Sequence, residues 1–206
     1  MHVRSRKNSV AALATALVAT AAVVVAPPLA GSAHAGMTYF KNGDLIKLKT
    51  NWGDEHYSLN VGGPYGSTFD GWHAQIAHDG HWDNPSQFFV DGTYVGENHT
   101  WVRLRNNHSQ KCLTADTGTI AYVVQRTCDL YGTDPSQWWA GEWGFGAPVW
   151  IRNLQHQRWG LNTVMTQRNP GLDGSLISMN PLVPDHSSQD WLLESCLVNG
   201  AQQKDC

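Results

Sequence analysis

A threefold repeat is the feature that most constrains the fold of this chain. Residues 85–89 read PSQFF, residues 135–139 read PSQWW and residues 187–191 read SSQDW. Self-similarity at a fixed period of roughly 20 to 50 residues is typical of folds built from repeated units. One unit of this size cannot bury its own apolar face, so we expect three units that pack together.

The first 35 residues are predicted to be a secretory signal peptide. A basic start (RSRK, residues 4–7) precedes an apolar run over residues 10–27, and AHA at residues 33–35 is typical of a cleavage site. The run is too short for a membrane span. We therefore expect a secreted, extracellular protein that begins at Gly36, with residues 36–43 as an N-terminal arm that is either free or paired as an edge strand.

The charge of the predicted mature chain argues against nucleic acid as a partner. Removal of residues 1–35 leaves 11 Lys and Arg against 17 Asp and Glu. A surface with this acidic balance is poorly suited to phosphate backbones or anionic membranes.

Four cysteines, Cys112, Cys128, Cys196 and Cys206, survive signal cleavage. An even number in an exported chain implies disulfides, and four cysteines allow three connectivities. We favour Cys112 with Cys128 and Cys196 with Cys206, because each pair closes a short loop, which is worth ~3 kcal/mol in the chain-entropy model. Residues 195–206 would then form a disulfide-closed tail.

Alternating apolar residues predict short strands in each unit. LIKLK at residues 45–49 alternates with period two, and residues 101–106 and 149–153 open the next two units in the same way. Two further strands are expected in each unit. Their apolar anchors are Leu59, Leu113 and Leu161 in the second strand, and Ile76, Val124 and Ile177 in the third.

A repeat of this length, in which each copy ends in Gln-x-Trp or a close variant, resembles the ricin B-type β-trefoil family over about residues 44–194. The first copy departs from the pattern, with Phe89 where the family has Trp. The resemblance implies an all-β fold, a β-trefoil of three repeated four-strand units. Phe89, Trp139 and Trp191 are expected to fill the shared core.

The family it resembles binds sugars in shallow pockets, one per unit, and this likeness supplies the candidate ligand-binding residues. The family's Asp after the second-strand anchor matches Asn60, Thr114 and Asn162, none of which is a carboxylate, so the charge-assisted bond is lost. The remaining candidates are the stacking aromatics and the supporting glutamines. They are Trp72, Trp82, Tyr122 and Tyr131, with Gln87, Gln137 and Gln189. The aromatics fit a core or protein-contact role as well.

We expect a protein that is not an enzyme and that needs no cofactor. The histidines of residues 73–83 match no zinc-enzyme spacing, and no nucleophile elbow or phosphate-binding loop is present. The resemblance implies a carbohydrate-binding module with glycans as partners. The alternative is an adaptor or binding subunit of a secreted, toxin-like complex that contacts other secreted proteins.

Overall fold

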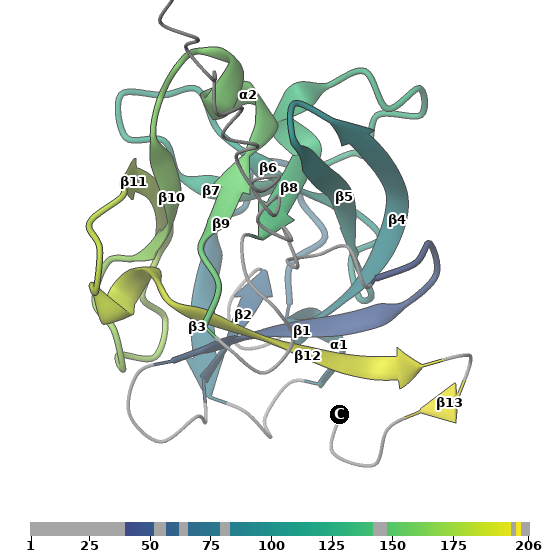
Figure 1. Ribbon diagram of the computed structural model, residues 1–206. Helices are drawn as coiled ribbons and strands as arrows, with labels where there is room; N and C mark the ends of the chain where they lie inside the picture. Colours follow the sequence, from purple (N-terminus) through teal and green to yellow (C-terminus); the bar gives the residue numbers. More distant parts are fainter. Residues whose placement is uncertain are drawn as a thin grey trace, which may run out of the picture. The chain divides into compact units, whose positions relative to one another are not determined.

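Short strands make up nearly all of the regular structure (Figure 1). The computed structural model describes residues 40–51, 57–61, 66–78, 83–141, 148–198 and 201–202. The strands are β1 (Leu45–Thr50), β2 (Tyr57–Val61), β3 (Ala74–His78), β4 (Gln87–Gly96), β5 (His99–Asn106), β6 (Cys112–Ala115), β7 (Val123–Arg126), β8 (Trp138–Gly141), β9 (Ile151–Asn153), β10 (Thr163–Gln167), β11 (Ile177–Pro181), β12 (Trp191–Val198) and β13 (Ala201–Gln202). The helical segments are α1 (Asp83–Ser86), α2 (Leu154–Arg158) and the 3₁₀ turns η2 (Pro135–Gln137) and η3 (Ser187–Gln189). Among these residues no helix is long and apolar enough to cross a membrane.

The strands fall into three consecutive groups of four, β1–β4, β5–β8 and β9–β12. The outer strands of the groups pair antiparallel with one another, β1 with β4 and β12, β5 with β4 and β8, and β9 with β8. The long β4–β5 hairpin and the adjacent β1 and β12 are visible in Figure 1. The inner strands form the hairpins β2–β3, β6–β7 and β10–β11. Single bridges join these hairpins, His73 to Val124, Gln75 to Leu176 and Tyr122 to Ser178. The architecture is the predicted β-trefoil.

Large aromatic side chains from the fourth strands fill the shared core. Trp139 and Trp191 are fully buried, as predicted. Each indole nitrogen donates to a second-strand carbonyl, Trp139 Nε1 to Leu113 O at 2.9 Å and Trp191 Nε1 to Met165 O at 3.0 Å. The two units therefore use the same aromatic in the same way, and the buried N–H is satisfied in both.

The predicted core aromatic of the first unit is wrong by one residue. Phe88, which lies opposite Ile46 on β1, is fully buried, whereas Phe89 is only partly buried and the Arg105 guanidinium lies 5.2 Å from its ring. Gln87 already belongs to β4, whereas Gln137 ends the turn η2 before its strand begins. Because neighbouring strand residues face opposite sides, this one-residue shift exchanges the inward and outward aromatic.

The second strand of the third unit also differs from the prediction. The helix α2 is inserted after β9, so the strand runs over Thr163–Gln167 rather than residues 159–162. Leu161 is 45% exposed and is not a core anchor. Met165 takes that place, since it receives the Trp191 hydrogen bond as Leu113 receives that of Trp139. The third-strand anchors Ile76, Val124 and Ile177 are buried, as predicted.

The disulfide between Cys112 and Cys128 is confirmed, with an S–S distance of 2.01 Å. The second pairing stays a prediction because Cys206 lies outside the described residues, as do the signal segment and residues 36–39 of the arm. Phe40, in the same arm, is buried in the core, so this part of the arm is not free. β12 pairs with β1 as far as Leu197, so the fourth strand of the third unit continues into the predicted tail, which begins at residue 195.

Candidate ligand-binding cleft

Two of the three positions that the family resemblance assigned to sugar contact are closed. Asn60 is fully buried and Thr114 is 2% exposed. In the third unit the equivalent residue is Thr166, not Asn162, because it follows the anchor Met165. The hydroxyls of Thr114 and Thr166 each donate to a backbone carbonyl two residues earlier, at 3.0 Å. The two threonine hydroxyls are therefore engaged inside the strands, and none of these side chains offers a carboxylate to a ligand.

The glutamines of the second and third units hold loops in place. The Gln137 side chain accepts from Asp129 N at 2.9 Å and donates to Thr127 O at 3.0 Å. Gln189 does the same for residues 181–183, accepting from Val183 N and donating to Pro181 O, both at 2.8 Å. Gln87 instead accepts from the Asn107 amide at 3.0 Å. All three glutamines are buried supports rather than exposed ligand contacts.

The loop of residues 129–135 is fixed around the Asp129 carboxylate. That carboxylate accepts hydrogen bonds from the backbone of Tyr131 (3.1 Å), Asp134 (2.8 Å) and Thr133, and from the Thr133 hydroxyl (2.9 Å). These bonds, that of Asp134 N foremost, lower the pKa of Asp129 to about 2. Because the Cys112–Cys128 disulfide and Gln137 tie the preceding residues, the loop is held firmly at its base.

This fixed loop presents two apolar side chains to solvent. Leu130 is 89% exposed and Tyr131 is 87% exposed. Neither contributes to the core, and exposed apolar residues on a well-anchored loop are more often used for recognition than for stability.

Trp138 forms the wall next to the loop. Its indole nitrogen donates to Gly132 O at 3.0 Å, and the Tyr94 ring meets it edge-on with centroids 6.2 Å apart. The Arg103 guanidinium lies 5.8 Å from its ring centroid. Gly132 has φ +67°, and a Cβ there would lie 3.2 Å from the indole, so glycine is required for this close approach.

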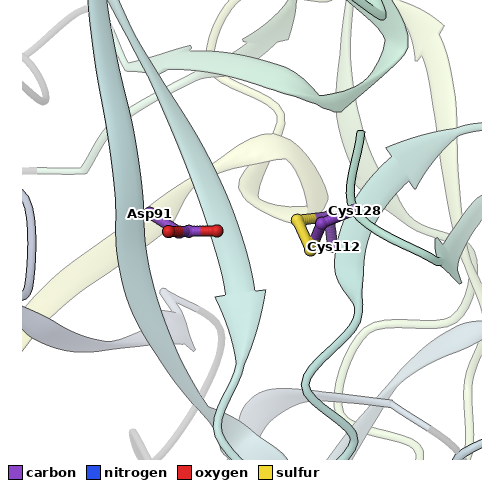
Figure 2. Close-up of side chains that lie close together, drawn as sticks. All are labelled: Asp91, Cys112 and Cys128. Carbon is purple, nitrogen blue, oxygen red and sulfur yellow. A yellow bond between two sulfur atoms is a disulfide. The ribbon is translucent and has the colours of Figure 1, made fainter. Parts of the chain in front are cut away.

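Arg103 is held in this place by Asp91. Arg103 Nε donates to Asp91 O at 2.9 Å and Nη2 to the Asp91 carboxylate at 3.2 Å, while Nη1 donates to Asp129 O. Figure 2 shows the Asp91 side chain beside the sulfur atoms of Cys112 and Cys128. This trio is unsuited to a metal, because the two sulfur atoms are bonded to each other and Asp91 is paired with Arg103 and Arg105.

Together these groups line a cleft of about 560 Å³, which we call the Tyr131 cleft. One side is the β4–β5 hairpin at Thr93 and Tyr94, another is the 130–135 loop, and the third is α2 with Leu154 and Arg158. Arg158 pairs with Glu97 at 2.8 Å and remains partly exposed. The volume lies within the range of roughly 300–1,000 Å³ typical of small-ligand sites, and the lining is mostly apolar with a few polar groups.

Of the residues predicted from sequence, the cleft contains Tyr131, and Gln137 supports its loop. Trp72 is 47% exposed on the segment of residues 66–73 and does not line the cleft, whereas Tyr122 is partly buried against His73 and Arg168. Asn162 lies at the surface, accepts from Arg152 at 2.5 Å and borders a separate depression of about 310 Å³. Trp82 lies outside the described residues. The residues that the sequence interpretation missed are Tyr94, Arg103, Leu130, Trp138 and Arg158.

Solved structures with the same fold include a toxin, a designed protein and a lectin. A mosquitocidal holotoxin matches with TM-score 0.61 and 13% identity over 79% of this chain and 18% of that chain. ThreeFoil, a designed threefold-symmetric protein, matches with TM-score 0.56 and 19% identity over 72% of this chain and 96% of that one. A Polyporus squamosus lectin, solved with the epitope Neu5Acα2-6Galβ1-4GlcNAc, matches with TM-score 0.56 and 12% identity over 76% of this chain and 50% of the lectin chain.

This chain therefore spans about a fifth of the holotoxin and half of the lectin. No protein-family profile and no curated protein sequence matches it. The similarity establishes the β-trefoil fold.

Proposed function

We propose that this protein is a secreted, non-enzymatic carbohydrate-binding module whose site is the Tyr131 cleft. The observation that carries the proposal is the 87% exposed Tyr131 ring, held on a hydrogen-bonded loop above a cleft walled by Trp138 and Tyr94. Aromatic rings stack on the apolar C–H face of a sugar, and a tyrosine on a fixed backbone has only two side-chain torsions to order when it binds.

Polar groups at the rim supply the hydrogen bonds that a sugar needs. Thr93 and Thr133 present hydroxyls, and Arg158 retains donors beyond the Nε that binds Glu97. Arginine donors form charge-assisted bonds with carboxylates and strong bonds with hydroxyl oxygens. The site thus replaces the family's Asp acceptors with arginine donors on a different surface.

The test begins with a glycan array on the mature protein and continues with titration of the best glycan. Tyr131→Ala should weaken binding about tenfold, or ~1.4 kcal/mol, since it removes the stacking ring. Trp72→Ala, which removes another exposed aromatic outside the cleft, is the matched control and should leave affinity unchanged. Equal losses in the two variants, or a loss confined to Thr114→Val, would contradict the proposed site.

A protein partner is the second candidate, and the exposure of Leu130 favours it. A leucine that is 89% exposed gains little from a sugar but is suited to a pocket on another protein, as is Val95 at 80% exposure on the neighbouring hairpin. A pull-down from culture medium with wild type and Leu130→Ser separates the two functions. Loss of a protein partner in Leu130→Ser, with an empty glycan array, would favour the adaptor.

A further inference from the structure

A second pocket lies between the second and third units, on residues that the Tyr131 cleft does not use. It encloses about 290 Å³ and is lined on one side by residues 116–121, the connection between β6 and β7. The other side comes from the third unit, with Trp159, Leu161 and Thr163 following α2, and Met179 and Asn180 on β11. We call it the Trp159 pocket.

Trp159 is held in place by the end of α2. Gly160 N donates to Gln157 O and Leu161 N to His156 O, both at 2.9 Å, which is a Schellman motif with Gly160 at φ +73°. The ring of the buried His156 lies against the indole, with centroids 5.7 Å apart and a 31° tilt. His156 Nδ1 in turn lies 2.8 Å from Thr163 Oγ1. An indole that is 53% exposed is thus fixed at the edge of a pocket.

Hydrogen-bonding groups line the same pocket as this ring. Asn180 donates to Ser178 Oγ at 3.0 Å, and its amide oxygen accepts no hydrogen bond from the described residues. Across the pocket, the Asp116 carboxylate accepts from Thr117 N at 2.8 Å and pairs with Arg126 at 3.3 Å. The pocket thus offers an amide acceptor, a carboxylate whose charge is balanced by Arg126, and threonine hydroxyls beside the Trp159 indole. These groups suit a small, neutral ligand with several hydroxyl groups on a ring.

The pocket depends on a feature that the second unit does not share. α2 occupies the connection between β9 and β10, whereas the matching connection of the second unit, residues 107–111, is a turn without a helix. The insertion that displaced the predicted strand is what brings Trp159 beside the β6–β7 connection.

We infer that the Trp159 pocket is a second binding site, which takes a single neutral hexopyranose stacked on Trp159. This inference goes beyond the Tyr131 cleft and rests on separate residues. A protein with two such sites would bind branched or clustered glycans through both.

The experiment is a titration of the ¹⁵N-labelled mature protein with galactose and with N-acetylglucosamine, observing the indole N–H signals. Trp159→Phe identifies the Trp159 signal and preserves an aromatic ring. One of the two sugars should shift the Trp159 signal saturably, with Trp159→Ala weakening this site about tenfold and Asn180→Ala several-fold. Trp72, which is similarly exposed, is the internal control, and its signal should not move.

The same titration of Tyr131→Ala separates the two proposals. A Trp159 shift that persists in Tyr131→Ala supports an independent second site. A Trp159 shift that disappears in Tyr131→Ala, or no Trp159 shift while the Tyr131 cleft still binds, overturns the second site and leaves the first intact. No response at either place from these sugars overturns the second site, and an empty glycan array overturns the first.

Discussion

The second and third units have the same interior and different exteriors. Val102 lies opposite Trp139 in one unit and Val149 opposite Trp191 in the other, and all four residues are fully buried. The adjoining outward positions, by contrast, hold Arg103 over Trp138 in the second unit, and Trp150 with Asp190 in the third.

The outward aromatic residues of the two units have different surroundings. In the third unit Trp150 Nε1 donates to the Asp190 carboxylate at 3.1 Å, so the outward pair satisfies itself. In the second unit the indole instead forms the wall of a cleft that Arg103, Tyr94 and the 130–135 loop surround. The repeat therefore specifies the fold through its inward residues, whereas the outward residues differ between the units.

The equivalence of the two interiors predicts equal and large losses of stability. Trp139→Ala and Trp191→Ala each remove a fully buried indole and its hydrogen bond, so each should lower the free energy of unfolding by about 3–5 kcal/mol. Chemical denaturation monitored by circular dichroism measures both. A loss below about 1 kcal/mol in either variant would contradict the shared role.

The next prediction compares two buried asparagines. The Asn106 amide donates to Pro85 O and Gln87 O, and that of Asn153 donates to Ser136 O and Trp138 O. Replacement of either by Ala leaves buried carbonyls unpaired and should cost about 1–3 kcal/mol in denaturation experiments.

Asn153 is also the N-cap of α2, because its side-chain oxygen accepts from Gln155 N and His156 N. Asn153→Ala should therefore weaken ligand binding as well, whereas Asn106→Ala should affect stability alone. Equal binding in the two variants, measured by titration under native conditions, would show that α2 does not shape either site.

These results bear on what the sequence could predict. Period-two alternation and the Gln-centred repeat are strong signals for buried strands, and they identified all three units. The Cys112–Cys128 link was predicted from the short loop that it closes. The two strand signals placed Phe89 wrongly because β4 begins at the glutamine itself, one residue earlier than β8 does, and Leu161 because α2 displaces the strand that follows it. A repeat alignment of one sequence does not detect such shifts within single copies.

The cleft was harder to predict for a different reason. Tyr94, Tyr131 and Arg158 come from three segments that only the tertiary fold brings together. Arg103 also looked like an ordinary outward residue of an alternating strand. The sequence did contain one indication of the cleft, the adjacent Leu130 and Tyr131, which are two large hydrophobic residues inside a turn-rich stretch.

A smaller effect is expected from Asp129, which organises the loop of the second unit. Asp129→Asn replaces one accepting oxygen by an amide that cannot accept from Thr133 N or Asp134 N. Glycan affinity should fall several-fold with the fold intact. Asp185→Asn, in the corresponding loop of the third unit, is the control, and the two variants should be compared by titration at pH 7. No change in Asp129→Asn would mean that the loop does not need its carboxylate.

The smallest effect concerns His156, which is particular to the third unit. Burial lowers the pKa of His156 below its usual 6.5, and the Asp116 carbonyl partly offsets this. The folded state thus favours the neutral ring, so its contribution to stability is complete above about pH 6.5 and declines as the pH falls through that value.

Unfolding free energies at pH 7.5 and pH 5 for wild type and His156→Gln test this directly. The wild type should lose more stability than the variant between the two pH values. An identical pH dependence would show that His156 does not titrate differently in the folded and unfolded states.

The most direct measurement of the central claim is a chemical-shift map of the mature protein with the best glycan from the array. The account predicts that the largest changes lie in the amides of residues 130–133, the Trp138 indole and Tyr94. Changes centred instead on Asn60, Thr114 and Thr166, the positions equivalent to the family's sugar contacts, would contradict it.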